Sequence, residues 1–320
     1  MKFNSIFDQP ANKRRRQAAV AAAAASAGVT ASAGVTAGTG AGDFRSGAAY
    51  LSTPAMDLAV SAASATQRPL LVTGPAGCGK SSLARSTAAR LGWRYLERTV
   101  NSRTEINSLL WDVDQLRRLQ DAHAGGLKDD LLSYVRPSVL WQALDARTAA
   151  NPLLLRQPAP ARLAARNPPT DPAVVLIDEI DKADPDLPNN LLEVLGGLRF
   201  EVADTGCRVA CSSGVPLILI TSNDERDLPP AFVRRCIVLN LQQPDLAKVA
   251  ALHFPKDGTL VAQALRLLDD TAANPQAYPP SAAEFLDFVQ ACKTLKVRAG
   301  ADAWLALAEA VVLKGRAGRA

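Results

Sequence analysis

The chain has 320 residues, of which 48% are hydrophobic, and a formal net charge of +5. A chain of this length and composition can bury a large core and exceeds one average domain, which excludes both a disordered protein and a small disulfide-stapled scaffold. Its five cysteines are scattered and odd in number, which argues against a secreted disulfide framework and favours a reducing, cytoplasmic compartment.

The first 46 residues are predicted to form a flexible arm. Almost all of the net positive charge lies within residues 1–50, with a cluster at Lys13–Arg16, so the rest of the chain is nearly neutral. Residues 17–42 carry no charge and are mostly Ala, Gly, Ser, Thr and Val. This run resembles a secretory leader and is long enough to cross a bilayer. Its weak hydrophobicity and repeated glycines favour a low-complexity arm and no membrane segment.

A phosphate-binding loop is predicted where a short apolar strand, entered through Pro69, ends. The sequence Gly74–Ser81 matches G-x-x-x-x-G-K-[ST], between helices expected over 50–66 and 82–91. Glycines let backbone N–H groups approach phosphate oxygens, and the N-terminus of the following helix adds partial positive charge. The residues predicted to contact the nucleotide are Gly74, Pro75, Ala76, Gly77, Cys78, Gly79, Lys80, Ser81 and Ser82.

Two side chains of this loop have distinct expected roles. Lys80 would reach the β and γ phosphates, and the hydroxyl of Ser81 would bind Mg²⁺. Taken alone, the pattern also fits a glycine turn that binds nothing, so motifs elsewhere in the chain must decide.

The next part of the chain predicts mixed structure. A strand is expected over 93–100, one polar helix over 104–123, a loop at Arg136–Pro137 and a short helix over 138–146. Residues 150–173 are rich in proline and predict an exposed connection.

A buried parallel strand is predicted over 174–177, because four apolar residues follow one another without a polar one. Asp178 and Glu179 close it, and Asn223 follows a second apolar strand. Four helices after residue 244 predict a helical lid. The expected elements are a helix over 188–198, a β-hairpin over 199–210, strands over 215–220 and 237–241, a short helix over 228–235, and lid helices over 245–253, 259–273, 281–294 and 301–313.

Lys80 and Asp178 would both lie at carboxyl ends of strands in one parallel sheet, the edge where open α/β sheets bind ligands. Asp178 is placed to hold Mg²⁺, and Glu179 to orient and deprotonate an attacking water. A solvated strand end is the alternative for this acidic pair taken alone.

Together, the loop and the sequence Leu-Ile-Asp-Glu-Ile-Asp-Lys-Ala at 176–183 resemble an AAA+ ATPase. The predicted hairpin at 199–210 makes the chain similar to the MoxR-like branch. The resemblance covers about residues 47–315. It implies a P-loop NTPase α/β domain, a parallel sheet flanked by helices, over 47–243, and a small all-helical lid over 244–320.

The resemblance also implies site residues, cofactors and partners. Asn223 stands at the sensor 1 position, and Arg235, or second Arg234, at the arginine finger. Alanines near Ala283 stand where a sensor 2 arginine is expected, which leaves Arg298 as a substitute. The implied cofactors are ATP and Mg²⁺. The implied assembly is a homo-oligomeric ring, a hexamer, that acts on a client protein such as one with a von Willebrand factor A domain.

Two other functions stay open from the sequence. The same core could drive a nucleic-acid motor or loader, with the basic arm meeting the phosphate backbone. Alternatively, ATP binding without turnover could make the chain a signalling switch, which the missing sensor 2 arginine leaves open.

Overall fold

The computed structural model describes residues 3–27, 49–157, 172–271 and 280–313. The chain forms two compact units, each described by itself. Unit 1 comprises Met1–Ala19, Pro54–Thr73 and Thr87–Leu239, and unit 2 comprises Val20–Thr53, Gly74–Ser86 and Asn240–Ala320.

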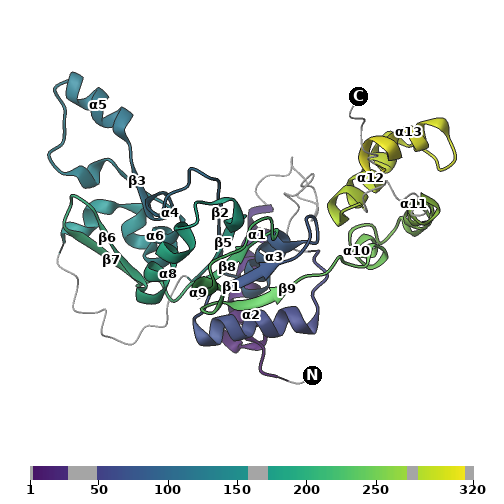
Figure 1. The fold of residues 1–320 in the computed structure, drawn as a ribbon, viewed down its shortest axis with the longest axis horizontal. Coiled ribbons are helices and arrows are strands. Elements are labelled where there is room, and N and C mark those ends of the chain that lie inside the picture. Colours follow the sequence, from purple (N-terminus) through teal and green to yellow (C-terminus); the bar gives the residue numbers. More distant parts are fainter. Residues whose placement is uncertain (1–2, 28–48, 158–171, 272–279, 314–320) are drawn as a thin grey trace. The chain divides into compact units, whose positions relative to one another are not determined.

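Unit 1 is built on a five-stranded sheet with the strand order β2-β5-β8-β1-β9 (Figure 1). Adjacent strands from β2 to β1 pair in parallel, and Ile177 lies opposite Ile220, which lies opposite Leu71. The strands alternate with helices along the chain, which confirms the predicted α/β class. The strands are β1 (Leu70–Thr73), β2 (Arg94–Thr99), β5 (Ala173–Asp178), β8 (Leu217–Thr221) and β9 (Ile237–Asn240).

Strand β5, which lies between β2 and β8, is buried on both faces. Val175 and Ile177 belong to a large apolar cluster, and their neighbours Val174 and Leu176 point to the opposite face yet are equally buried. This burial explains the uninterrupted apolar sequence of the strand.

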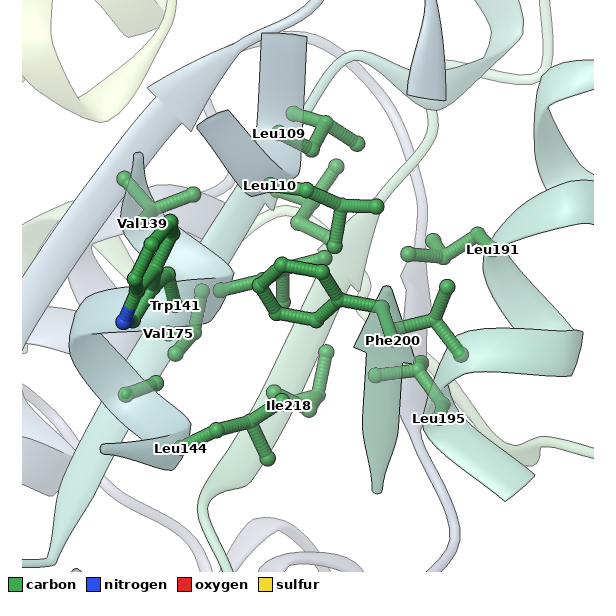
Figure 2. Close-up of a cluster of buried hydrophobic side chains, with 14 of the residues drawn as sticks. Leu109, Leu110, Val139, Trp141, Leu144, Val175, Leu191, Leu195, Phe200 and Ile218 are labelled. Atoms are coloured by element: carbon green, nitrogen blue, oxygen red, sulfur yellow. The ribbon is translucent and has the colours of Figure 1, made fainter. Parts of the chain in front are cut away.

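Helices α6 (Val139–Leu144) and α8 (Leu187–Gly197) contribute to the apolar cluster that covers one face of the sheet (Figure 2). The ring of Trp141 meets Phe200 edge to face, with centroids 5.7 Å apart. Its indole N–H donates to the hydroxyl of Thr148, so this large side chain is buried with its polar group satisfied.

The predicted helices around the loop are confirmed as α2 (Pro54–Thr66) and α3 (Lys80–Leu91). Gly92 ends α3 with a φ of +66°, as expected for a helix C-cap. A β-carbon at Gly92 would lie 2.7 Å from the backbone of Arg15, so the N-terminal segment passes close to this turn.

The flexible-arm prediction is wrong for the first part of the arm. Residues Ile6–Asp8 form a 3₁₀ turn, η1, and Pro10–Ala27 form the helix α1. Asn12 is buried and accepts a hydrogen bond from the indole of Trp93 at 3.0 Å, and Arg90 stacks 3.6 Å from the ring centre of Phe7. Alanine favours helix locally, and the contacts of Phe7 and Asn12 hold the beginning of this segment against other parts of unit 1. Residues 28–46 of the predicted arm lie outside the described residues.

The single helix predicted over 104–123 is also wrong, because a strand interrupts it. Trp111–Val113 form β3, which pairs antiparallel with β4 (Val135–Pro137), the segment predicted as a loop. Asp114 then starts a new helix by accepting a hydrogen bond from the N–H of Arg117. The other elements of this region are α4 (Ile106–Leu110), α5 (Gln115–His123), η3 (Leu131–Ser133), α7 (Ala146–Ala150) and η4 (Pro152–Arg156). Residues 158–171 of the predicted connection lie outside the described residues.

The predicted hairpin is confirmed between α8 and β8. Its strands β6 (Arg199–Val202) and β7 (Cys207–Ala210) pair antiparallel. Two shorter helical elements lie next to strands of the sheet in the sequence. The 3₁₀ turn η6 (Ile180–Lys182) follows β5, and the helix α9 (Pro230–Val233) precedes β9.

Unit 2 contains the four predicted C-terminal helices. They enclose their own core, in which the rings of Phe288 and Trp304 lie 5.0 Å apart. Unit 2 also contains Gly74–Ser86, which the predicted division at residue 243 places with the sheet. Within the described residues, no helix is both long and apolar enough to cross a membrane. The helices are α10 (Leu246–His253), α11 (Gly258–Thr271), α12 (Ala282–Leu295) and α13 (Asp302–Val311).

Candidate functional site

The predicted phosphate loop has a backbone conformation that favours glycine at three positions. Gly74, Gly77 and Gly79 have φ angles of +138°, +73° and +95°. A β-carbon at Gly74 would lie 2.3 Å from the carbonyl oxygen of Leu241, and one at Gly77 would lie 2.1 Å from the β-carbon of Ser281. The loop is therefore held by close packing as well as by its glycines.

Lys80 is buried within this loop at the first residue of α3. Its ammonium group donates to the carbonyl oxygens of Gly74 at 2.7 Å and Pro75 at 2.9 Å. The start of α3 adds the positive end of the helix dipole at the same place. The loop therefore places an ammonium group beside the N-terminus of a helix, an arrangement suited to a polyphosphate.

The surroundings of the loop include side chains that the sequence did not single out. The ring of Tyr50 lies 3.3 Å from the position of a β-carbon at Gly79, and Gln243 donates to the carbonyl of Ala76 at 3.4 Å. Burial raises the pKa of the Tyr50 hydroxyl and the pKa of the Cys78 thiol. Both groups stay neutral at physiological pH, so they add no negative charge that would repel phosphate.

A second cluster forms at the carboxyl edge of the sheet in unit 1. Asp178 ends β5 and Thr221 ends the neighbouring β8, and the Thr221 hydroxyl donates to the carboxylate of Asp178. The same hydroxyl oxygen accepts from the backbone N–H of Glu179 at 2.9 Å. Thr221 is almost fully buried, so this link fixes both acidic residues relative to the sheet.

Glu179 departs from the strand in the left-handed backbone region, with φ +62° and ψ +49°. A non-glycine residue in this region is strained, and such strain persists where surrounding contacts impose it. The carboxylate of Glu179 pairs with the ammonium of Lys182 at 2.9 Å, which raises the pKa of Lys182.

Asp181 is a further acidic residue that the sequence reasoning did not assign. It is only 2% exposed, and one carboxylate oxygen accepts from the backbone N–H groups of Asn223 at 3.0 Å and Glu225 at 3.1 Å. The other oxygen has no hydrogen-bond partner among the described residues. Asp181 thus holds the segment after β8, and with it the sensor 1 candidate, against the end of β5. The sequence offered one indication of this role, because Asp181 lies two residues after the acidic pair. The 3₁₀ turn that directs it toward the segment after β8 was not predicted.

The two arginine finger candidates lie at the end of α9, with exposed side chains. Their backbone carbonyls are both bound by the guanidinium of Arg68. Through the hydrogen bonds of Thr221 and Asp181, the structure brings Asp178, Glu179 and Asn223 together at one edge of the sheet.

Thr73, the residue before the loop, ends β1 in the same sheet, next to β8. A joint Mg²⁺ site of Ser81 and Asp178 stays a prediction, as does the role of Ser82 at the loop.

The comparison with protein families bears on this arrangement. The family model described as AAA domain (dynein-related subfamily) matches residues 69–236, more than half of the chain. The chain belongs to this AAA family. The matched span begins just before β1 and ends just after Arg235, so the AAA domain contains the loop, the acidic edge and both arginines. No curated protein matches the sequence.

Among solved structures, the AAA chain is similar to NtrX from Brucella abortus in two crystal structures. With the ADP complex the identity is 15% and the TM-score 0.43, over 78% of this chain and 52% of NtrX. With the ATP complex the identity is 14% and the TM-score 0.43, over 88% and 57%. The match therefore spans little more than half the length of the NtrX chain.

Proposed function

We propose that this AAA protein binds ATP with Mg²⁺ and hydrolyses it, and that it works in the cytoplasm as a MoxR-like homo-oligomeric ring that remodels or activates a partner protein. One observation carries the proposal. A glycine loop with a buried lysine follows β1, and a fixed carboxylate pair closes β5 in the same parallel sheet. Parallel sheets of this kind bind ligands along that edge.

In the proposed complex, the loop from Gly74 to Ser82 binds the phosphates through backbone N–H groups and the ammonium of Lys80. Ser81 and Asp178 would hold Mg²⁺, which neutralises charge on the phosphates when bound. Hydroxyl and carboxylate oxygens are the ligands that this ion prefers.

Glu179 is the proposed residue that orients and deprotonates the attacking water. Its backbone N–H is bound by the hydroxyl of Thr221, and its carboxylate lies 2.9 Å from the ammonium of Lys182. A carboxylate held in place beside the phosphates can act as the general base for water. Asn223, on a segment held by Asp181, would orient the same water and sense the γ phosphate. These roles depend on positions fixed before the nucleotide arrives, which favours catalysis.

A ring follows from the proposed role of Arg235, or second of Arg234. The developing charge on the phosphoryl group is stabilised by a guanidinium, and a finger delivered by a neighbouring subunit has no role in a monomer. The exposed side chains of both arginines are compatible with donation to a neighbour. The hairpin β6–β7 before β8 supports the MoxR-like assignment, and a client with a von Willebrand factor A domain is the first to test.

The test uses Glu179→Gln, which keeps the shape of the side chain and removes the base. We expect unchanged ATP affinity, phosphate release lowered by at least about a hundredfold, and an ATP-dependent oligomer on size exclusion with light scattering. The matched variant Lys80→Ala should lose nucleotide binding itself. A protein that stays monomeric with ATP would refute the ring, and undiminished turnover would refute the role of Glu179.

A nucleic-acid motor is the second candidate, and the exposed cations Lys13, Arg14 and Arg16 on α1 favour it. ATP turnover that rises with DNA and loses this response as salt increases would support that function. Capture of a client protein by the ATP-bound Glu179→Gln variant would support remodelling. A nucleotide switch would instead keep its partner response in the same variant without any turnover.

A further inference from the structure

Arg68 makes an unusual pair of contacts with the turn that carries both finger candidates. Its Nε donates to the carbonyl oxygen of Arg235 at 2.9 Å, and a terminal guanidinium nitrogen donates to the carbonyl of Arg234. The next residue, Pro69, accepts a hydrogen bond from the N–H of Ile237 at 2.8 Å. The turn is therefore bound on its carbonyl side and at the residue that starts β9.

The chemistry of these contacts suits their place in the fold. The last carbonyls of a helix have no partner within the helix, and α9 ends at this turn. A guanidinium offers several N–H donors in a rigid planar fork, so one side chain can bind two adjacent carbonyls at once. Lysine, with a single ammonium on a flexible stem, would hold the turn less strictly.

This clamp fixes the backbone of the arginines and leaves their side chains exposed. Phe232 and Cys236 on either side of the pair are buried, so the chain on both sides of the exposed arginines is anchored in unit 1. Two long cationic side chains thus extend from a rigid base. A rigid base reduces the misplacement of a catalytic group, and a shift of about 1 Å can cost a hundredfold in rate.

We propose that Arg68 is a positioning residue for the arginine finger. Its guanidinium sets the direction in which the side chains of Arg235 and Arg234 extend from the end of α9. Arg68 itself lies directly before Pro69, which leads into β1. Because β1 continues into the phosphate loop, one short stretch of chain holds the subunit's own nucleotide at one end and aims its finger from the other. This inference rests on the proposed function, since the finger acts only within a ring.

The first experiment compares Arg68→Ala and Arg68→Lys with Arg117→Ala, an exposed arginine on α5 outside the site. We expect Arg68→Ala to lower ATP turnover about tenfold or more and to leave the Kd for a fluorescent ATP analogue unchanged. The ATP turnover of Arg68→Lys should lie between that of Arg68→Ala and that of the wild type. The turnover of Arg117→Ala should equal that of the wild type. Circular dichroism establishes folding, and if Arg68→Ala unfolds, Arg68→Lys carries the same tests.

The decisive experiment mixes pairs of variants that each have lowered turnover. In a ring, Arg235→Ala retains an intact water-activating site and Glu179→Gln retains an intact finger, so mixing them should restore turnover at shared interfaces. Mixing Arg68→Ala with Glu179→Gln should restore turnover to a similar degree, because only the finger of the Arg68 variant is misplaced. Arg234→Ala is mixed in parallel to identify which arginine is the finger.

The outcomes separate the two levels of the proposal. Restoration with Arg235→Ala or Arg234→Ala but not with Arg68→Ala means that Arg68 serves its own subunit, which overturns the inference and leaves the ring intact. Failure of both arginine mixtures overturns the trans finger, and with it the inference. An increase in the Kd for nucleotide in Arg68→Ala, equal to its loss of turnover, also overturns the positioning role.

Discussion

The phosphate loop and the acidic edge are built by opposite means. The loop Gly74–Ser81 takes its shape from glycine backbone with positive φ and from close packing that leaves no room for a β-carbon. The acidic edge takes its shape from side-chain hydrogen bonds. Thr221 bonds to Asp178 and Glu179, and Asp181 bonds to the backbone of the segment that carries Asn223. A larger side chain in the loop therefore causes a steric clash that neighbouring residues cannot relieve. At the acidic edge, by contrast, single hydrogen bonds can be removed one at a time.

The largest effect is expected in the loop. Gly74→Ala places a methyl group against a backbone oxygen in a strained conformation, and we expect a loss of about 3 kcal/mol in the free energy of unfolding, with loss of ATP binding. Chemical denaturation and titration with a fluorescent ATP analogue measure the two effects.

Gly196→Ala is the matched control for this variant. Gly196 lies in α8, where a β-carbon would meet nothing within 4 Å. We expect this change to stabilise the protein by about 0.5 kcal/mol, because alanine loses less backbone entropy in a helix. Equal behaviour of the two alanines would contradict the claim that packing fixes the loop.

A smaller effect is expected at the acidic edge. Asp181→Ala leaves the N–H groups of Asn223 and Glu225 without their acceptor, and we expect a loss of about 2 kcal/mol in unfolding free energy with slower ATP turnover. Asp181→Asn retains an acceptor oxygen and should lose less than about 1 kcal/mol. Denaturation and phosphate release test the pair, and equal losses in both would show that charge, not hydrogen bonding, is what matters.

The smallest effect concerns the thiol buried in the loop. Burial raises the pKa of Cys78 above its value in the unfolded chain. The stability that this group contributes is therefore complete below the unfolded pKa, and it is lost as the pH rises from there through the folded pKa. Melting curves from pH 7.5 to 10.5 should show that wild type loses stability relative to Cys78→Ala at the alkaline end. A constant difference between the two proteins would contradict a neutral buried thiol.

The parts of the fold that the sequence predicted share a strong local pattern. The continuous apolar run of β5 and the alternation of β6 and β7 each predict one structure, and burial confirms them. The missed parts depend on partners far away in the chain. Trp111–Val113 became a strand because Val135–Pro137 pairs with it, and α1 is anchored through Asn12 and Trp93, 81 positions apart.

The sequence by itself determined the class of fold, the glycine loop, the acidic pair and the candidate arginines, because each is encoded by residue types at short fixed spacing. Only the tertiary structure decided what holds them. Three sets of hydrogen bonds join residues more than forty positions apart. They link Asp181 to the backbone of Asn223, Thr221 to the two acidic residues, and Arg68 to the carbonyls of the arginine turn. Such contacts follow from the register of the strands and from the burial of polar groups that must find partners, neither of which a local pattern contains.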